Sequence, residues 1–314
     1  MQEYFNLAKK LLTVHNTGVL KCMRIRNGLC TVSNSKLSYV TFIPEFENID
    51  ATVDAKKFIA ACEGANYLPS IKQTDKMLSI SKGSFKARIA LAEEVYPEIL
   101  VRGESVSLSL ETFNTLKRLQ PFVSNDVSRP WACGVMFDTK HAYATNNVVA
   151  ARVRLDTPRK FTLPAFALTE LLRASADVVR VTMNDNAVRF ELSNGISLQS
   201  SLTNLPWPDI GSIIDNSKAD GMLIEPGIRK AIESLVPLCA NLAVPQINLS
   251  ENGMATVEGD SQAHYEGYSF PPSSFHSVPL LEVLKVANEV NFAGYPKPCY
   301  FKGPIVEGVL MGLR

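Results

Sequence analysis

The sequence has almost no net charge, and it shows neither the residue pattern of a leader segment nor an apolar run of membrane-spanning length. Its formal net charge is +1 with 20% charged residues, so it lacks the basic excess of a protein that holds nucleic acid by charge alone. No apolar run approaches the roughly 20 residues of a membrane span. No basic segment followed by an apolar core opens the chain. We therefore expect a soluble, unexported, cytoplasmic protein, without a membrane partner, whose binding of any DNA depends on more than bulk charge.

Motifs for metal binding and catalysis are also missing. The cysteines show no CxxC pair, which predicts free buried thiols rather than a zinc site or a disulfide framework; they are Cys22, Cys30, Cys62, Cys133, Cys239 and Cys299. No GxxxxGK[ST], GxGxxG, HExxH or GxSxG motif occurs. The histidines lie far apart without metal-ligand spacing: His15, His141, His264 and His276. We predict a protein that is not an enzyme, with no catalytic residue, metal or cofactor, although an active site assembled from distant residues stays open.

What the sequence does contain is a pattern that recurs. Residues 3–12 read EYFNLAKKLL and residues 111–120 read ETFNTLKRLQ, while a second helical pattern begins near Val53, Leu163 and Val278. Polar turn residues follow the endings YPEI at Ile99 and WPDI at Ile210. The repeat of about 110 residues matches the usual size of a domain. The sequence therefore predicts three domains, at 1–103, 104–218 and 219–314.

Each repeat reads as a helix, strands, a second helix and more strands. Alternating strands flank Asn27-Gly28, a strong hairpin signal. Similar hairpins are predicted at 132–154, at 178–202 around Asn194-Gly195, and from Pro245 onward. The expected fold class is α+β, with an antiparallel sheet and two helices in each of three repeated domains.

Several of these segments resemble a known family. The relevant stretches are DVSRPWACGVMF from Asp126, AYATNNVVAARV from Ala142, LPAFALTELLR from Leu163 and LTNLPWPDIGSII from Leu202, with VDAKKFIAACEG before them and VEGVLMGLR at the end. In order and spacing they are similar to the bacterial sliding clamp, the beta subunit of DNA polymerase III. The resemblance spans nearly the whole chain and rests on scattered positions, and the third repeat matches least.

The resemblance implies a DNA clamp fold in which helices line a ring. A chain of three domains would then pair as a head-to-tail homodimer. It would encircle double-stranded DNA without sequence specificity, accept a clamp loader and tether the replicative DNA polymerase as a processivity factor in DNA replication. The short chain favours a clamp encoded by a phage or mobile element. A clamp-fold modulator or decoy that binds replication partners without encircling DNA is the alternative.

The six expected helices carry the basic residues that would face DNA. A basic pair recurs at matched places in two repeats, although each lysine taken alone could equally be an ordinary solvated helix residue. Arg24 and Arg26 are weaker candidates on a strand. The predicted DNA-binding residues are Lys9, Lys10, Lys56, Lys57, Lys117, Arg118, Arg173, Arg229, Lys230 and Lys285.

The family's partner groove is an apolar pocket that binds short peptides, and a few buried side chains supply most affinity in such pockets. The family's Gly-His-Arg is Asn147-Val148-Val149 here, which alters the expected pocket. The C-terminal segment also reads simply as a last β-strand that fills its domain. The predicted groove residues are Ala132, Thr145, Asn146, Asn147, Val148, Val149, Ala150, Val309, Leu310, Met311 and Leu313.

Overall fold

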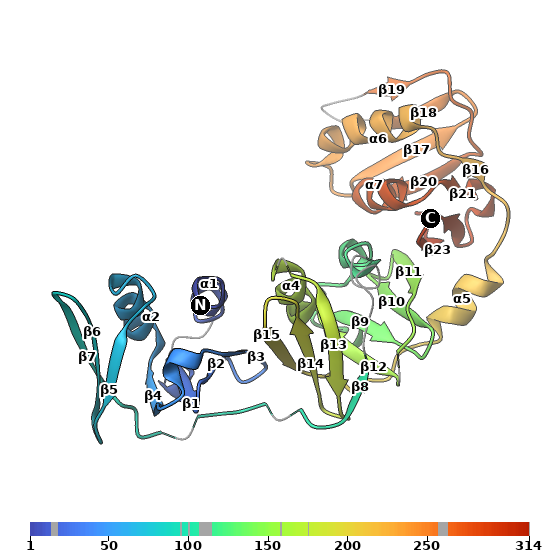
Figure 1. The fold of residues 1–314 in the computed structure, drawn as a ribbon. Coiled ribbons are helices and arrows are strands. Elements are labelled where there is room, and N and C mark those ends of the chain that lie inside the picture. The colour runs from blue at the N-terminus through green and yellow to red at the C-terminus, as the bar shows by residue number, and fades with distance from the viewer. Residues whose placement is uncertain are drawn as a thin grey trace. The chain divides into compact units, whose positions relative to one another are not determined.

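The computed structural model describes residues 1–13, 18–94, 96–99, 101–106, 115–157, 159–174, 176–256 and 263–313. The chain forms two compact units (Figure 1). The first unit combines Met1–Leu110 with Glu170–Leu202, and the second combines Glu111–Thr169 with Thr203–Arg314. Each unit is built around an eight-stranded sheet whose strands come from two separate parts of the chain.

The first unit joins its two parts where β3 pairs with β15, antiparallel, from Thr41 opposite Ile196 to Leu37 opposite Ser200. The turn between β1 and β2 places Asn27 and Gly28 at φ values of 49° and 78°, the left-handed backbone that a two-residue hairpin turn requires. In spatial order the strands are β4 (Asp50–Asp54), β1 (Cys22–Arg26), β2 (Leu29–Ser33), β3 (Leu37–Phe42), β15 (Ile196–Ser201), β14 (Ala187–Leu192), β13 (Val178–Met183) and β8 (Glu104–Val106).

Helices α1 (Gln2–Leu11) and α2 (Ala55–Gly64) cover one face of this sheet (Figure 1). Asp54 caps α2 by accepting a hydrogen bond from the Lys57 N–H at 3.0 Å. Phe5 of α1 and Phe58 of α2 are fully buried, with their rings edge to face at 6.3 Å. Alternate residues of a strand point to opposite faces, so Arg24, Arg26 and Leu29 lie on the face away from these helices. We call that face the outer face.

A smaller sheet continues the first unit, formed by β5 (Ser70–Gln73), β6 (Met77–Lys82) and β7 (Phe85–Ala90). The chain leaves β7 beside β4, with a bridge between Leu91 and Val53 and a hydrogen bond of 2.7 Å from the Ala92 N–H to the Thr52 carbonyl. Residues 91–94 and 96–99 follow, and they border the outer-face pockets described below.

The second unit repeats this plan, since β11 pairs antiparallel with β23 from Val149 opposite Leu310 to Val153 opposite Val306. The β10–β11 turn is held by the Asn146 side chain, which accepts hydrogen bonds from the N–H groups of Val148 and Val149. In spatial order the strands are β12 (Phe161–Pro164), β9 (Gly134–Phe137), β10 (His141–Thr145), β11 (Val149–Arg154), β23 (Val306–Leu310), β22 (Cys299–Lys302), β21 (Glu289–Val290) and β16 (Met222–Leu223).

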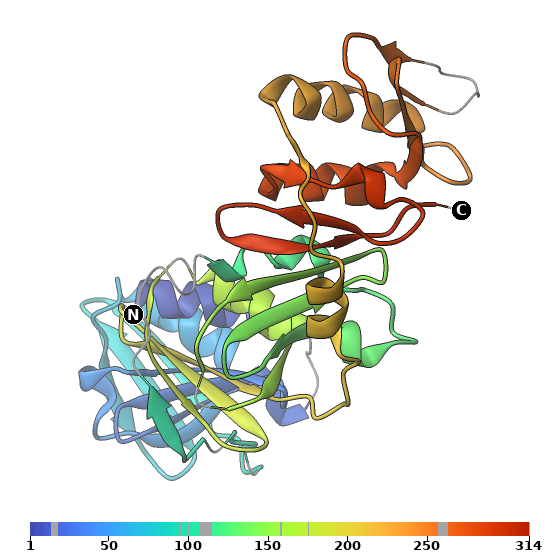
Figure 2. The same ribbon diagram turned by 90° about the vertical axis from the view of Figure 1, so that its right-hand side faces the viewer.

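The second unit has further layers around this sheet. Helix α7 (Ser277–Val286) contacts β23, and α6 (Pro226–Cys239) packs beside α7 (Figure 2). Helix α5 (Ile210–Asn216) contacts β11 and β23, and α4 (Ala165–Arg173) runs from β12 into the first unit. A four-stranded sheet completes the unit, in the order β19 (His264–Tyr265), β18 (Gly253–Thr256), β17 (Gln246–Ser250) and β20 (Ser273–His276).

Most of the predicted elements are confirmed. The hairpins expected around Asn27-Gly28, at 132–154, at 178–202 and after Pro245 are present. The helix expected at 111–120 begins outside the described residues. The three domain boundaries stay a prediction, because each compact unit contains strands from two of the predicted domains.

The six cysteines are free, as expected, although Cys133 is partly exposed rather than buried. Of the histidines, His15 lies outside the described residues. No helix in the described part of the chain is long and apolar enough to cross a membrane.

Candidate nucleic-acid interface and partner-binding surface

In the first unit, the predicted DNA-binding lysines lie at the exposed sides of α1 and α2. The buried face of α1 carries Phe5, Ala8 and Leu11, which leaves Lys10 exposed. Lys56 and Lys57 are exposed in the first turn of α2. Lys9 instead forms an ion pair with Glu63, which ties α1 to α2. Three of these four lysines are therefore available to an external anion, while Lys9 is partly neutralised within the unit.

Arg173 lies at the end of α4 and pairs with Glu170 one turn earlier. The Glu170 carboxylate also accepts a hydrogen bond from the Tyr39 hydroxyl at 3.0 Å. Burial is the main reason why the pKa of Tyr39 is raised, with the Glu170 charge adding to it. Arg173 therefore has an internal role at the helix end, in addition to the predicted contact with DNA.

In the second unit, three predicted basic residues meet around one pocket of about 200 Å³. Arg118, Arg229 and Lys285 come from sequence-distant segments, and the apolar wall includes Val286 and Ile305. The Arg229 Nε is buried and has no hydrogen-bond acceptor among the described residues. Lys285 also forms an ion pair with Glu282 at 2.7 Å. The pocket therefore presents cationic donors that an anion such as a phosphate oxygen could satisfy.

Lys117 and Lys230 are exposed next to two of these residues in the sequence, but neither lines the pocket. The sequence pattern thus selected the three basic residues that line the pocket but not its uncharged residues. Val286, Asn288 and Ile305 carry no charge pattern that would have selected them.

The predicted partner groove brings two distant segments together. Val149 lies opposite Leu310 and Ala150 opposite Val309, and the Met311 N–H donates to the Val148 carbonyl at 2.8 Å. The C-terminal segment is thus the strand β23 and its extension, as the strand interpretation predicted. Ala132 lies in the short helix η4 (Pro130–Ala132), where it is fully buried and bonded to Arg129 and Ser124.

These groove residues face two sides of the sheet. Ala150 and Val309 belong to a buried cluster with Ile210 and Ile214 of α5, which makes this side the outer face of the second sheet. Val149 and Leu310 are buried too, and strand alternation points them to the opposite side. Thr145 is buried and accepts the Asn147 N–H. The accessible part consists of five residues that are exposed or half-buried: Asn146, Asn147, Val148, Met311 and Leu313.

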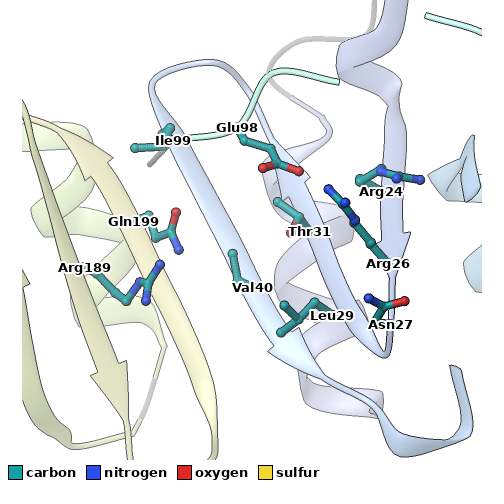
Figure 3. A pocket seen from close by; sticks show the side chains of 10 residues that line it. All are labelled: Arg24, Arg26, Asn27, Leu29, Thr31, Val40, Glu98, Ile99, Arg189 and Gln199. Atoms are coloured by element: carbon teal, nitrogen blue, oxygen red, sulfur yellow. The ribbon is translucent and has the colours of Figure 1, made fainter. Parts of the chain in front are cut away.

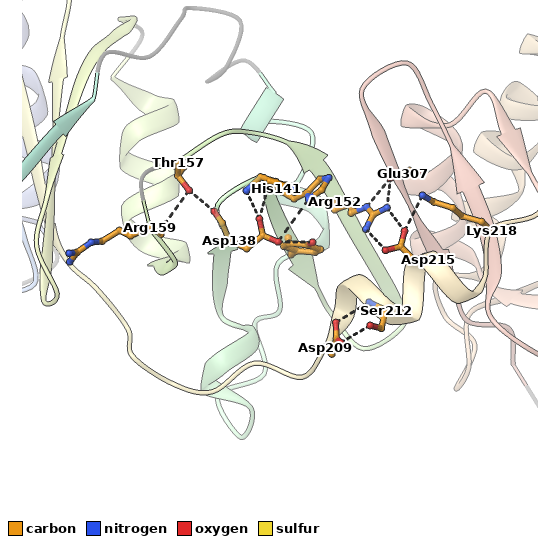
Figure 4. Close-up of polar contacts among 12 residues, drawn as sticks. Asp138, His141, Arg152, Thr157, Arg159, Asp209, Ser212, Asp215, Lys218 and Glu307 are labelled. Carbon is orange, nitrogen blue, oxygen red and sulfur yellow. Dashed lines mark hydrogen bonds and ion pairs between the residues drawn. The ribbon is translucent and has the colours of Figure 1, made fainter.

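A polar network that the sequence did not predict holds α5 against β11 and β23 (Figure 4). The Arg152 side chain, only 5% exposed, donates to both Asp215 oxygens and to Glu307. Lys218 pairs with Asp215 at 3.0 Å, and the Tyr300 hydroxyl donates to Glu307 at 2.5 Å. The partners lie 63 and 155 residues from Arg152 in the sequence, so no local pattern could have shown them.

This network changes the acid–base behaviour of its members. The hydrogen bond from Arg152, supported by Lys218, holds the pKa of the Asp215 carboxyl far below its usual range. Burial lowers the pKa of His141, and the nearby Arg152 charge lowers it further. Burial and the hydrogen bond to Asp138 raise the pKa of Tyr143 to about 12. The shift at Asp215 favours its paired carboxylate, whereas the shifts at His141 and Tyr143 favour the neutral imidazole and the neutral phenol. In the described part of the chain, no group of His, Cys, Asp and Glu is placed to hold a metal ion.

Comparisons with known proteins gave results at the level of structure only. No protein-family model matches the chain, and no curated sequence matches it. Among solved structures, the beta subunit of the DNA polymerase of Streptococcus pyogenes is similar with a TM-score of 0.82 and 16% identity. The sliding clamp of Bacillus subtilis gives 0.80 and 18%, and that of Caulobacter crescentus gives 0.79 and 18%.

Each of these three comparisons covers 99% of this chain and 96% of the other. At such low identity the similarity concerns the fold, and the expected phage origin stays a prediction. The chain therefore has the α+β sliding-clamp fold of the DNA polymerase III beta subunits, as its sequence resemblance predicted.

Proposed function

We propose that the chain is the subunit of a DNA sliding clamp, a non-enzymatic ring that encircles duplex DNA and tethers the replicative polymerase. The observation that carries this proposal is the meeting of Arg118, Arg229 and Lys285 around one pocket, within a clamp fold that spans the chain. Exposed Lys10, Lys56 and Lys57 supply similar charges in the first unit.

Weak phosphate contacts suit a protein that holds DNA by topology. Phosphate contacts carry no sequence information, and a net charge of +1 leaves no large electrostatic barrier to movement along the duplex. Arg118, Arg229 and Lys285 can each donate to a phosphate oxygen that enters the pocket. This arrangement supports binding without sequence specificity.

Ring closure would need a second copy of the chain. With three domains per chain, two chains in head-to-tail contact supply six domains, and such a heterologous contact closes only if the rotation is right. The predicted domains 1–103, 104–218 and 219–314 are the units of this proposal.

The accessible residues Val148, Met311 and Leu313 would take short apolar peptides from the polymerase and the clamp loader. The Caulobacter crescentus clamp was solved with polyethylene glycol in a region proposed to tether the beta motif. A peptide-binding role for these residues is supported by the hydrogen bond between Val148 and Met311 in the C-terminal extension of β23.

A retention assay on nicked circular and linear DNA tests the proposal, combined with the mass of the protein in solution. We expect a dimer that stays on the circle and runs off free ends. Replacing Arg118, Arg229 and Lys285 by Gln should lower the slope of log K against log salt by about 2 to 3, or about 0.9 per lost phosphate contact. Lys36→Gln in the β2–β3 turn is the matched control.

Two results would contradict the ring. A monomer that leaves circular and linear DNA equally fast would favour the non-encircling modulator. An unchanged salt slope in the triple variant, with its melting temperature preserved, would remove the pocket from the DNA interface.

A further inference from the structure

The outer face of the first sheet carries a pocket of about 380 Å³ that the proposed DNA and partner contacts do not use. Figure 3 shows Arg26 and Arg189 on opposite sides of a floor that contains Thr31 and Val40. The wall is formed by β1, β2, β3, β14, β15 and the segment after β7, and it includes Arg24, Arg26, Leu29, Ile99, Arg189 and Gln199.

Two of the three arginines are held in place. With its amide oriented to satisfy its neighbours, Gln199 donates to the Ile99 carbonyl at 2.6 Å and accepts from the Nε and Nη2 of Arg189, each at 3.0 Å. Gln199 is only 5% exposed, so this support is buried. Arg24 is paired with Asp50. The Arg26 side chain is exposed and has no hydrogen-bond or ion-pair partner among the described residues, so it is available to an external acid.

The same surface is apolar between the arginines. Leu29 and Phe42 are opposite each other on β2 and β3, and they are 49% and 53% exposed. Val40 and Ile99 add to this apolar area. Large apolar side chains that share an exposed face mark an interaction surface more often than isolated ones do.

A second pocket of about 520 Å³ adjoins the first and shares Arg24 and Glu98 with it. Its wall adds Asp50, Glu93 and Glu94. The charge therefore changes from positive around Arg26 and Arg189 to negative around Glu93 and Glu94. The acidic part would repel a continuous polyanion such as nucleic acid, whereas a peptide can carry both signs of charge.

We propose that this surface binds an extended peptide segment of a partner protein. Acidic residues of the peptide face Arg26 and Arg189, an aliphatic or aromatic residue covers Leu29 and Val40, and basic residues face Glu93 and Glu94. Charge complementarity selects the peptide and sets its direction, and the apolar contact supplies the burial. The proposal does not depend on ring formation or on DNA binding.

Labelled synthetic peptides test it by fluorescence anisotropy with the full-length protein at low salt. Two probes contain Asp-Glu-Asp, Leu-Phe and Lys-Lys blocks in opposite orders, so that either chain direction is sampled. We expect one of them to bind with a Kd in the micromolar range. Arg26→Glu should weaken it at least tenfold, and changing Leu-Phe to Ala-Ala in the peptide should do the same. Lys36→Glu, an exposed change outside both pockets, should leave the Kd unaltered.

A charge exchange makes the test independent of folding. A peptide with lysines in place of its acidic block should bind the Arg26→Glu protein more tightly than the unsubstituted protein. Equal binding by both proteins would overturn the proposal, as would the absence of binding by either probe. Competition by a twelve-residue oligothymidine that Arg26→Glu abolishes would assign the surface to nucleic acid instead.

Discussion

The two units build the same kind of sheet and treat its outer face differently. In the second unit, α5 covers the joint between β11 and β23, where Ile214 is fully buried and Arg152 is paired with Asp215 and Glu307. In the first unit, the region around the joint between β3 and β15 forms a pocket, where Leu29 and Arg26 are exposed. One outer face is thus filled by the chain itself and the other stays open.

The difference shows how one architecture provides two kinds of surface. A helix that covers the sheet buries the apolar side chains of the sheet and holds the sheet's arginine in an internal ion pair. An uncovered sheet keeps its apolar side chains and its arginine available to a partner, but it exposes apolar area to water. The comparison predicts that substitutions on the outer face lower the unfolding free energy strongly in the second unit and weakly in the first.

Removing apolar side chains is expected to give the largest contrast. Ile214→Ala should cost about 2–5 kcal/mol of unfolding free energy, because it leaves a cavity in a packed cluster. Leu29→Ala should cost less than about 1 kcal/mol, since the side chain is already half exposed. Urea unfolding of both variants measures this. Equal losses would show that Leu29 is as well packed as Ile214 and that the first outer face is not open.

The arginines give the next contrast. Arg152→Met should cost about 2 kcal/mol of unfolding free energy, because it leaves Glu307 and Asp215 without their cation. This is less than the roughly 3–5 kcal/mol for breaking a fully buried pair, because Asp215 is half exposed. Arg26→Met should change stability by less than about 0.5 kcal/mol. Thermal unfolding at pH 7 gives both values. A neutral Arg152→Met would mean that α5 is held by its apolar residues alone.

The two joints also differ in how closely their strands are packed. A Cβ added at Gly308 would lie 2.2 Å from the Ala150 carbonyl oxygen and 2.6 Å from the Phe301 ring. The first unit instead pairs Tyr39 with Leu198 across its joint. Gly308→Ala should therefore destabilise by about 1–3 kcal/mol through overpacking, measured by urea unfolding. Stability at the level of the unsubstituted protein would show that the β11–β23 joint relaxes easily.

The sequence was sufficient for the elements that have local signals. The Asn27-Gly28 turn and the helical patterns at residues 3–12 and near Val53 depend on residues close in the chain, and all three elements are present. The basic residues on helices were found for the same reason. Their grouping into the pocket of Arg118 and Lys285 depends on packing and could not be read from spacing.

Long-range pairing explains what the sequence missed. The joint of β3 with β15 connects residues more than 150 positions apart, and the Arg152 network spans a similar interval. Neither leaves a local pattern, because the sequence around a strand arginine is the same whether that arginine forms an internal ion pair or faces solvent. Arg24 and Arg26 illustrate this, since they were weak candidates for DNA contact, which stays a prediction, and they line the outer-face pocket that their sequence did not indicate.

The smallest expected effect concerns pH and the exposed member of the α5 network. Arg152 holds the pKa of Asp215 below its usual range, whereas the unfolded carboxyl titrates near pH 4. A depressed pKa contributes stability that is fully present above the unfolded value and is lost as the pH falls toward the folded one. Asp215→Asn should therefore lower the melting temperature most at pH 7, and the gap should narrow below about pH 4. The effect stays modest because the Asp215 side chain is 52% exposed and solvent screens the pair.

Asp156→Asn, an exposed change outside the network, controls for the loss of one charge. A gap that is constant from pH 7 to pH 3 would show that the carboxylate charge does not hold α5 on its sheet, and the covered face would then differ from the open one by packing only.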